Sequence, residues 1–339
     1  MAAMATMAAV TAVINDSTGA DNRSSNCPNT QNLLVRVLPP VLIIEMLVGL
    51  PGNLIALWIF ICRLKVWRPN TLFLFNLVLA DFLLLISVPF RIDNHIRSEN
   101  WVFGDTWCRI NLFMLAVNRS GSIAFMTAVA MDRYFKVVHP HQRINHMTST
   151  QAKWVAVGIW IVVISLRIPL LATKLLYKYQ DQFLCRSFNP HEAIPPAIIV
   201  HYVVYIGEFV FPLLLLLFCS ARIAWILRQR QLDRKKKVRR AVHVVLVIVL
   251  VFVICFMPGI ATGLAGMAVR AVSADCATKQ LTAEVFMLCI GFTYMNSALD
   301  PIIYCFSSSM FRNSLRSSIN RLGLVDMRLS RRGSVISNG

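Results

Sequence analysis

Long, almost uninterrupted apolar runs dominate this chain, and short polar or basic stretches separate them. Each run reaches or exceeds the roughly 20 residues that a helix needs to cross the apolar core of a bilayer. All should be helical, because lipid offers the backbone no hydrogen-bond partner outside its own turns. We therefore expect seven transmembrane spans: Val37–Cys62, Thr71–His95, Asp105–Val138, Gln151–Thr173, Ala197–Leu227, Arg239–Val269 and Leu281–Cys305.

The predicted fold class is an all-α membrane protein, a seven-transmembrane helix bundle with a short amphipathic cytoplasmic helix after the seventh span. A composition of 57% apolar and 15% charged residues excludes a soluble globular protein. We expect residues 1–36 to form an extracellular glycosylated N-terminus, residues 37–305 the bundle, and residues 306–339 the amphipathic helix and a cytoplasmic tail.

Basic residues set the expected orientation. Of the net charge of +18, a large part lies in two segments that should be loops, Arg63–Arg68 after the first span and Arg228–Arg240 after the fifth, and these loops should be cytoplasmic. An odd number of spans then places the N-terminus outside the plasma membrane, where Asn15 and Asn22 begin glycosylation sequons. Because the second basic segment adjoins two spans, it should face anionic lipid rather than nucleic acid.

The nine cysteines fall into two groups. Those within or at the ends of spans should be reduced and buried: Cys62, Cys219, Cys255, Cys289 and Cys305. The remaining four face the oxidising compartment, where an even number predicts two bridges that three pairings could supply. We favour Cys108 with Cys185 and Cys27 with Cys276.

The third span carries an arginine in its apolar body. A charge there costs roughly 2.5 to 3.5 kcal/mol, so Arg119 needs a partner and is first interpreted as functional. It lies roughly 20 Å outward of Arg133 and shares a helical face with Leu112 and Leu115, which suits an amphipathic acid arriving from outside. A permanent buried carboxylate partner is the alternative. Arg167 and Glu208, on the fourth and fifth spans, are expected to pair with each other.

Short motifs occur in a fixed order along these spans: Gly52-Asn53, Leu77–Asp81, Asp132-Arg133-Tyr134, Trp160, Pro212, Cys255–Pro258 and Asp300–Tyr304. Together they resemble the rhodopsin-like G-protein-coupled receptors across all seven spans. The chain departs from that family at Phe256, where a tryptophan is common, and at Asp300, where an asparagine is common.

The resemblance implies roles for two polar groups. Asp132, Arg133, Tyr134 and Tyr304 would form the G-protein switch, with hinges in the helices at Pro258 and Pro301. A second group resembles the family's sodium site: Asp81, Asn118, Ser122, Asn296 and Asp300. Each of these residues alone would instead be interpreted as making an interhelical hydrogen bond. A candidate allosteric sodium ion is thus implied, and no cofactor is expected.

Within the family, the chain most resembles the hydroxycarboxylic acid receptors, with the oxoeicosanoid and hydroxyeicosatetraenoic acid receptors almost as close. The resemblance lies in Asn118–Ile123, Tyr134–His141, Phe218–Ile223, Leu227–Gln231 and Phe292–Ser297. In these receptors the arginine matching Arg119 holds a ligand carboxylate. Where hydroxycarboxylic acid receptors often carry a second arginine, this chain has Gly263, so an oxidised fatty acid stays an alternative to a short hydroxy acid.

The expected ligand-binding residues surround Arg119: Arg91, Asn94, Leu115, Ser187, Phe188 and Tyr294. Arg91 is the expected second cation, with pairing to Asp93 or reaching toward the interface as the alternatives. Trp101 and Phe292 are candidate walls. Retinal is excluded because its lysine position in the family holds Tyr294, and a protonated amine is disfavoured because its carboxylate position holds Leu115.

The resemblance implies a receptor that binds a carboxylate-bearing metabolite and signals through a heterotrimeric inhibitory-class G protein. Arrestin is a further candidate partner. A transporter or channel is the rival class, but the spans show no internal repeat and no charged pore ring. An enzyme is not expected, because no spacing of nucleophile and base or of metal ligands was found.

Overall fold

The computed structural model describes residues 32–64, 66–179, 181–187, 196–229, 232–271 and 276–321. Within these residues, seven helices are long and apolar enough to cross a membrane, which confirms the predicted helix bundle. They are α2 (Asn32–Trp58), α3 (Pro69–Ile96), α4 (Gly104–Val138), α5 (Ser149–Arg167), α7 (Pro196–Gln229), α8 (Leu232–Ala271) and α9 (Cys276–Ser307).

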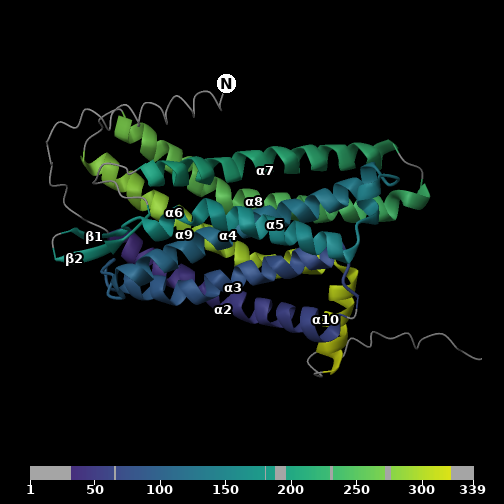
Figure 1. The fold of residues 1–339 in the computed structure, drawn as a ribbon, viewed down its shortest axis with the longest axis horizontal. Coiled ribbons are helices and arrows are strands. Elements are labelled where there is room, and N and C mark those ends of the chain that lie inside the picture. The colour runs from purple at the N-terminus through teal and green to yellow at the C-terminus, as the bar shows by residue number, and fades with distance from the viewer. Residues whose placement is uncertain are drawn as a thin grey trace, which may run out of the picture.

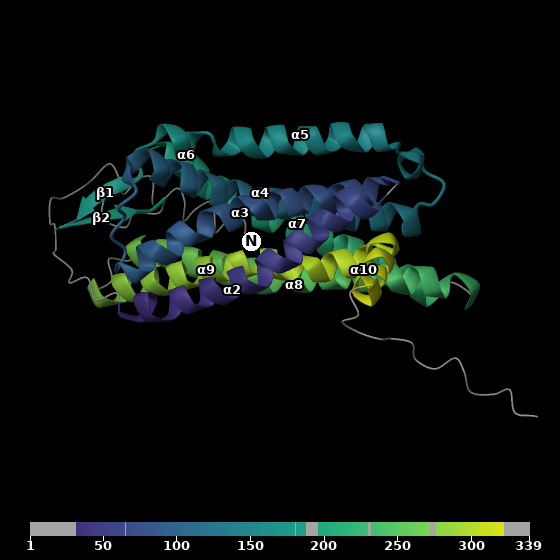
Figure 2. The ribbon, with the colours of Figure 1, turned by 90° about the horizontal axis from the view of Figure 1, so that it is seen from below.

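The long helices lie side by side along the longest axis of the molecule (Figure 1). A helix predicted after the seventh span, α10 (Ser309–Arg321), crosses one end of the bundle, and two short strands lie at the other end (Figure 2). We call these the α10 end and the hairpin end. Three short segments complete the described elements: η1 (Ile59–Arg63), η2 (Arg143–His146) and α6 (Pro169–Ala172).

The strands β1 (Leu176–Tyr179) and β2 (Gln182–Cys185) form an antiparallel hairpin in which Leu176 pairs with Cys185. A disulfide joins Cys185 to Cys108 in α4, which confirms the first predicted bridge. The bridge fixes the hairpin to the start of α4. The second predicted bridge involves Cys27, which lies outside the described residues, as do the sequons at Asn15 and Asn22.

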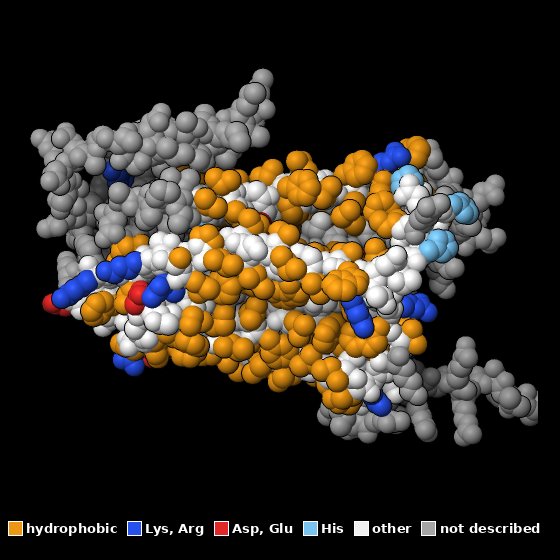
Figure 3. All heavy atoms as spheres, in the orientation of Figure 1, with side chains coloured by type: hydrophobic (Ala, Val, Ile, Leu, Met, Phe, Trp, Pro, Cys, Tyr) orange, Lys and Arg blue, Asp and Glu red, His pale blue; other side chains and the backbone are white. Residues whose placement is uncertain are grey.

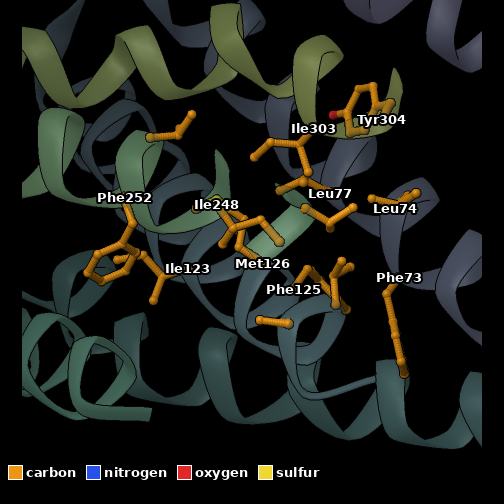
Figure 4. Packing of buried hydrophobic residues seen from close by; sticks show 14 of the residues in the cluster. Phe73, Leu74, Leu77, Ile123, Phe125, Met126, Ile248, Phe252, Ile303 and Tyr304 are labelled. Carbon is orange, nitrogen blue, oxygen red and sulfur yellow. The ribbon is translucent and has the colours of Figure 1, made fainter. Parts of the chain in front are cut away.

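The core lies between the helices of the bundle. Figure 4 shows buried side chains from four of them converging: Leu77, Met126, Phe252, Ile303 and their neighbours. Phe252 of α8 stacks on Phe209 of α7 with ring centroids 5.4 Å apart. Close packing of this kind fixes the helices relative to one another and so positions the polar side chains described below.

Apolar side chains also cover the outer surface of the bundle. Figure 3 shows them over the middle of one face, with most of the charged side chains nearer the two ends. Leu47, Trp154 and Phe211 are 69%, 71% and 67% exposed. Such a large exposed apolar surface would favour aggregation in water, and it matches a bilayer environment.

The helix boundaries differ from the sequence prediction in the basic segment Arg228–Arg240, which was expected to be a loop. The structure instead continues α7 to Gln229 and begins α8 at Leu232. Lysine, arginine and glutamine favour helix, and the segment holds neither glycine nor proline, so the helices extend past the apolar runs. At the end of the first span, the π-helical turn η1 was likewise not predicted.

Gly52 marks the closest approach between α2 and α9. A Cβ atom added there would lie 2.8 Å from Cγ of Pro301, whose ring cannot move away by rotating. We expect Gly52→Ala to lower the free energy of unfolding by about 1 to 3 kcal/mol through overpacking. The melting temperature of the purified protein measures this effect.

The matched control is Gly158→Ala in α5, where an added Cβ would meet nothing within 4 Å. This variant should melt within a few degrees of the unmodified protein. If both alanine variants melted alike, Gly52 would not be required for the packing of α2 on α9.

Candidate functional site

A cavity opens toward the hairpin end of the bundle between α2, α3, α4, α5, α7 and α9. Its apolar walls include Leu112, Leu115, Met287 and Ile290. Six basic side chains also line it: Arg91, His95, Arg119, Arg167, Arg186 and His201. Because a buried guanidinium must be paired or hydrogen-bonded, the partners of these groups decide what the cavity can bind.

Arg119 lies on α4 and reaches toward α7. Its Nη2 donates to Oε2 of Glu208 at 3.3 Å and to the carbonyl oxygen of Tyr205 at 3.2 Å. The guanidinium carbon lies 3.7 Å from the centroid of the Tyr205 ring, a cation–π contact. Among the described residues, Nε and Nη1 of Arg119 have no hydrogen-bond partner. The carboxylate considered as the alternative partner is therefore present in a partly buried position, but it engages one nitrogen only.

Arg167 is held more completely. Its side chain is 1% exposed, and Nε donates to Oγ of Ser120 at 3.0 Å. Nη1 lies 2.8 Å from Nδ1 of His201, which must accept because arginine carries donors only. Nη2 forms an ion pair with Oε2 of Glu208, which confirms the predicted pairing.

These four residues, Arg119, Arg167, His201 and Glu208, form the inner cluster. Two guanidinium groups share a single oxygen of Glu208. Both arginines stay charged at neutral pH, so the two arginines and the glutamate together carry one uncompensated positive charge. The inner cluster can therefore accept one anion.

A second group of charges lies nearer the hairpin: Arg91, His95, Glu99 and Arg186, which we call the outer cluster. Nη1 of Arg91 donates to the carbonyl oxygen of Cys185 at 3.0 Å, and its guanidinium lies 5.6 Å from the Trp101 ring centroid. Arg186 forms an ion pair with Glu99. His95 Nδ1 lies 3.6 Å from Oε1 of the same Glu99.

The backbone before Trp101 directs Glu99 into this cluster. Ser98 and Glu99 have φ angles of 55° and 65°, a left-handed conformation that is uncommon for residues other than glycine. The Glu99 amide donates to the carbonyl oxygen of Asn94 at 2.8 Å and closes the turn. Burial and, to a smaller extent, the nearby charge of Arg91 lower the pKa of Arg186 to about 10, while the charge of Glu284 opposes the shift. Arg186 therefore stays protonated at neutral pH.

Five of the expected ligand-binding residues line this one cavity: Arg91, Leu115, Arg119, Ser187 and Tyr294. Asn94 is buried but does not line it, and Phe188 lies outside the described residues. Asp93 pairs with Arg97 at 2.8 Å, so it is not the partner of Arg91.

Neither candidate wall residue lines the cavity. Trp101 packs behind Arg91 with its indole nitrogen donating to the carbonyl oxygen of Gly104. Phe292 is 41% exposed, so its prediction as a wall was wrong. Three further basic residues of the cavity were not predicted from the sequence: Arg186, His95 and His201. An arginine directly after the bridged Cys185 was the available signal for the first of these.

The predicted polar core lies deeper in the bundle. Asp81 accepts hydrogen bonds from the hydroxyls of Ser297 at 2.6 Å and Tyr304 at 2.8 Å. Asn118 donates to the carbonyl oxygen of Ala80 and to Oγ of Ser297. Asn296 donates to Oδ2 of Asp300 at 3.2 Å. Three buried oxygens have no hydrogen-bond partner in the described part of the chain: Ser122 Oγ, Asn296 Oδ1 and Asp300 Oδ1.

The predicted switch residues lie at the α10 end, apart from Tyr304 in the polar core. Asp132 binds Lys136 at 2.6 Å, and Nε of Arg133 is 3.9 Å from the same carboxylate. Arg133 also donates to the carbonyl oxygen of Ser307 at the end of α9. Arg133 thus connects α4 with α9.

Comparison with known proteins supplies the family. The model of the rhodopsin family of seven-transmembrane receptors matches residues 52–304. Human hydroxycarboxylic acid receptor 2 is 43% identical over 302 residues, which cover 88% of this chain and 82% of the relative. Human oxoeicosanoid receptor 1 is 38% identical over 290 residues, covering 86% and 74%.

The mouse receptor for 12-(S)-hydroxy-5,8,10,14-eicosatetraenoic acid is 33% identical over 301 residues, covering 88% of this chain and 93% of the relative. These similarities confirm the expected resemblance, and they extend over nearly all of the bundle. The chain therefore belongs to the rhodopsin family of seven-transmembrane, G-protein-coupled receptors, and it is a multi-pass membrane protein that acts as a receptor rather than as an enzyme.

Proposed function

We propose that this receptor binds a carboxylate-bearing metabolite through Arg119 and signals through an inhibitory-class G protein to lower cAMP. The observation that carries the proposal is the state of Arg119 itself. Its guanidinium faces a cavity with apolar walls, and its Nε and Nη1 have no partner among the described residues. The arginines and the glutamate of the inner cluster also carry one uncompensated positive charge.

A carboxylate satisfies both conditions. It neutralises the net charge, and its two oxygens can accept two hydrogen bonds from the planar guanidinium. Leu112 and Leu115, on the same face of α4, offer apolar contact to the carbon chain of the ligand. The hydroxyls of Tyr294 and Ser187 are available as hydrogen-bond donors to a hydroxyl or oxo group on that chain.

A short hydroxycarboxylic acid is the ligand class that we favour, because similarity to the hydroxycarboxylic acid receptors is high over most of the chain. An oxidised fatty acid is the alternative, supported by the similarity to the oxoeicosanoid and hydroxyeicosatetraenoic acid receptors. Gly263 favours the alternative, because it places no second cation at the position where hydroxycarboxylic acid receptors often carry an arginine. Family membership argues against a transporter.

The orientation belongs to the same proposal. The hairpin end and the glycosylated N-terminus would face the outside of the plasma membrane, and the α10 end would face the cytoplasm. The basic residues after the first and fifth spans support this orientation. The G protein, and arrestin in turn, would then contact the end that carries Asp132, Arg133 and Tyr134.

The polar core fits a sodium ion. Three of the expected residues, Ser122, Asn296 and Asp300, each present a buried oxygen that has no hydrogen-bond partner in the described residues. Oxygen atoms are the ligands that hard cations prefer. When bound, sodium would add a positive charge between Asp81 and Asp300 and offset their repulsion. Ser297 donates to Asp81 and accepts a hydrogen bond from Asn118, so these two side chains orient Asp81.

Substitution of Arg119 tests the ligand head group. Arg119→Ala should cost about 2 to 5 kcal/mol of binding, a loss of potency of roughly 30-fold to several thousand-fold, because a buried charge pair is removed. Arg119→Lys should restore binding only in part, since an ammonium group cannot form the bidentate contact. Dose–response curves for short hydroxy acids and oxidised arachidonate products, with their methyl esters, measure both effects.

The control for the Arg119 variants is Arg109→Ala. Arg109 lies on the same helix, pairs with Asp105 and does not line the cavity. Its potency should stay near that of the unmodified receptor. A best agonist that is neutral or cationic and indifferent to Arg119 would refute the carboxylate proposal.

Because Glu208 is shared, substitution of Glu208 and substitution of Arg167 should change ligand potency in opposite directions. Glu208→Gln should raise potency for acids, because a competing carboxylate is lost from Arg119. Arg167→Gln should lower potency by roughly tenfold, because Glu208 is then free to neutralise Arg119. In the double variant, potency should return toward that of the unmodified receptor. Ligand binding at matched surface expression measures all three, and a double variant as weak as Arg167→Gln would show that Arg167 acts only through folding.

Coupling is tested in cells. Agonist should lower stimulated cAMP, and toxin inactivation of inhibitory G proteins should abolish the response while ligand binding remains. A response of undiminished size after toxin treatment would contradict the coupling and leave the ligand proposal intact.

A further inference from the structure

The cavity is cationic at both ends, and the two ends are built alike. In the inner cluster, Arg119 and Arg167 share Glu208. In the outer cluster, Glu99 is the one described carboxylate that forms an ion pair with an arginine, and its partner is Arg186 rather than Arg91. All four arginines line the same cavity. Each end therefore presents two guanidinium groups against one paired carboxylate.

The outer cluster keeps unused hydrogen-bonding capacity. No described carboxylate forms an ion pair with Arg91, and its hydrogen bond among the described residues goes to the carbonyl oxygen of Cys185. Nε of Arg91 and Nε of Arg186 are buried and have no hydrogen-bond partner among the described residues. The next acid, Glu284 of α9, accepts a hydrogen bond from Gln280 and lies beyond ion-pair distance of Arg186. An anion at this end would meet an unpaired guanidinium.

Contacts between α3 and α4 give the separation of the two ends. Asn118 donates to the carbonyl oxygen of Ala80, so these two residues lie at the same depth in the bundle. Asn111 donates to the carbonyl oxygen of Ser87, so these two also share one depth, nearer the hairpin. Arg91 lies about one turn beyond Ser87 toward the hairpin, and Arg119 lies about two turns from Asn111 in the opposite direction. At roughly 1.5 Å per residue, the backbones of the two arginines are about 18 Å apart along the bundle.

The wall between the clusters is apolar where α4 forms it. Leu112 and Leu115 lie between the levels of Arg91 and Arg119 and line the cavity. Met287 and Ile290 of α9 add further apolar surface. A ligand that reached both clusters would therefore need an apolar middle and a charged group at each end.

We propose that the outer cluster binds a second acidic group of the same ligand, so that the preferred ligand class is an apolar chain with a carboxylate at each end. This inference rests on the proposed binding of a carboxylate at Arg119. A monocarboxylic acid would satisfy the inner cluster and leave the charge of Arg91 unmatched. A chain too short to reach both clusters would gain nothing from its second carboxylate.

The experiment compares acids of equal carbon number that differ in one carboxylate: butyrate with succinate, octanoate with suberate, decanoate with sebacate, and palmitate with hexadecanedioate. Binding to the purified full-length receptor is measured from ligand-dependent melting shifts. We expect no advantage for succinate and an advantage of roughly tenfold or more for at least one longer diacid, the gain typical of a hydrogen bond to a charged group. Half methyl esters of the diacids should bind like the monoacids.

Variants of the outer cluster assign the gain. Arg91→Gln and Arg186→Gln should each reduce the ratio of diacid to monoacid affinity toward one, because the second carboxylate loses its cationic partner. Glu99→Gln should increase the ratio, because it removes the competing carboxylate. Arg97→Gln, at the same end of α3 but exposed and paired with Asp93, is the matched control and should leave the ratio unchanged.

The results separate this inference from the proposed function. If Arg119→Ala left monoacid binding unchanged, the proposed head-group contact would fail, whatever the diacid ratio. If monoacids required Arg119 but no diacid bound better than its matched monoacid or half ester, the second site would be refuted. A diacid advantage that persisted in both Arg91→Gln and Arg186→Gln would also refute the second site. So would a receptor that bound neither the monoacids nor the diacids.

Discussion

The sharing of Glu208 by Arg119 and Arg167 is the interaction on which the site depends. A guanidinium within a membrane span is stabilised only by partners in the bundle, and a single carboxylate cannot neutralise two of them. Arg167 is fixed by Ser120, His201 and Glu208, so it holds the carboxylate from one side. Arg119 is left with free donors in a cavity. The bundle thereby keeps a cationic group available where lipid and apolar packing would otherwise exclude charge.

The rest of the fold maintains this arrangement. The Cys108–Cys185 bridge fixes the hairpin to α4, and the carbonyl oxygen of Cys185 accepts a hydrogen bond from Arg91, so the hairpin and α3 are joined beside the cavity. Asn118, the residue before Arg119 in α4, donates to Ser297, which in turn donates to Asp81. Tyr304 contacts the same carboxylate. A contiguous set of contacts therefore extends from the cavity through the polar core.

The sequence predicted the transmembrane spans more completely than the segments that join them. The spans were predictable because apolar runs of membrane length have one stable backbone conformation in lipid. The hairpin was not, because Tyr179–Gln182 lacks the asparagine or glycine residues that indicate a tight turn. Helical extension through Arg228–Arg240 was missed because positive charge was interpreted as a loop signal, although lysine and arginine favour helix.

The residues of the cavity could likewise be predicted from the sequence only in part. Arg119 could be identified from its charge within an apolar span, and the Arg167–Glu208 pair from two opposite charges on adjacent spans. That Glu208 would contact both arginines depends on the relative rotation of three helices, which a sequence pattern does not determine. Arg186 was missed because its position depends on the hairpin. Phe292 was wrongly taken as a wall because helical position alone did not show that it faces outward.

A structure of the receptor with a bound acid agonist would test the central claim most directly. The account predicts that the ligand carboxylate contacts Nε or Nη1 of Arg119, that Glu208 stays paired with Arg167, and that the carbon chain lies against Leu112 and Leu115. A ligand bound elsewhere, with Arg119 still contacting only Glu208 and Tyr205, would contradict it.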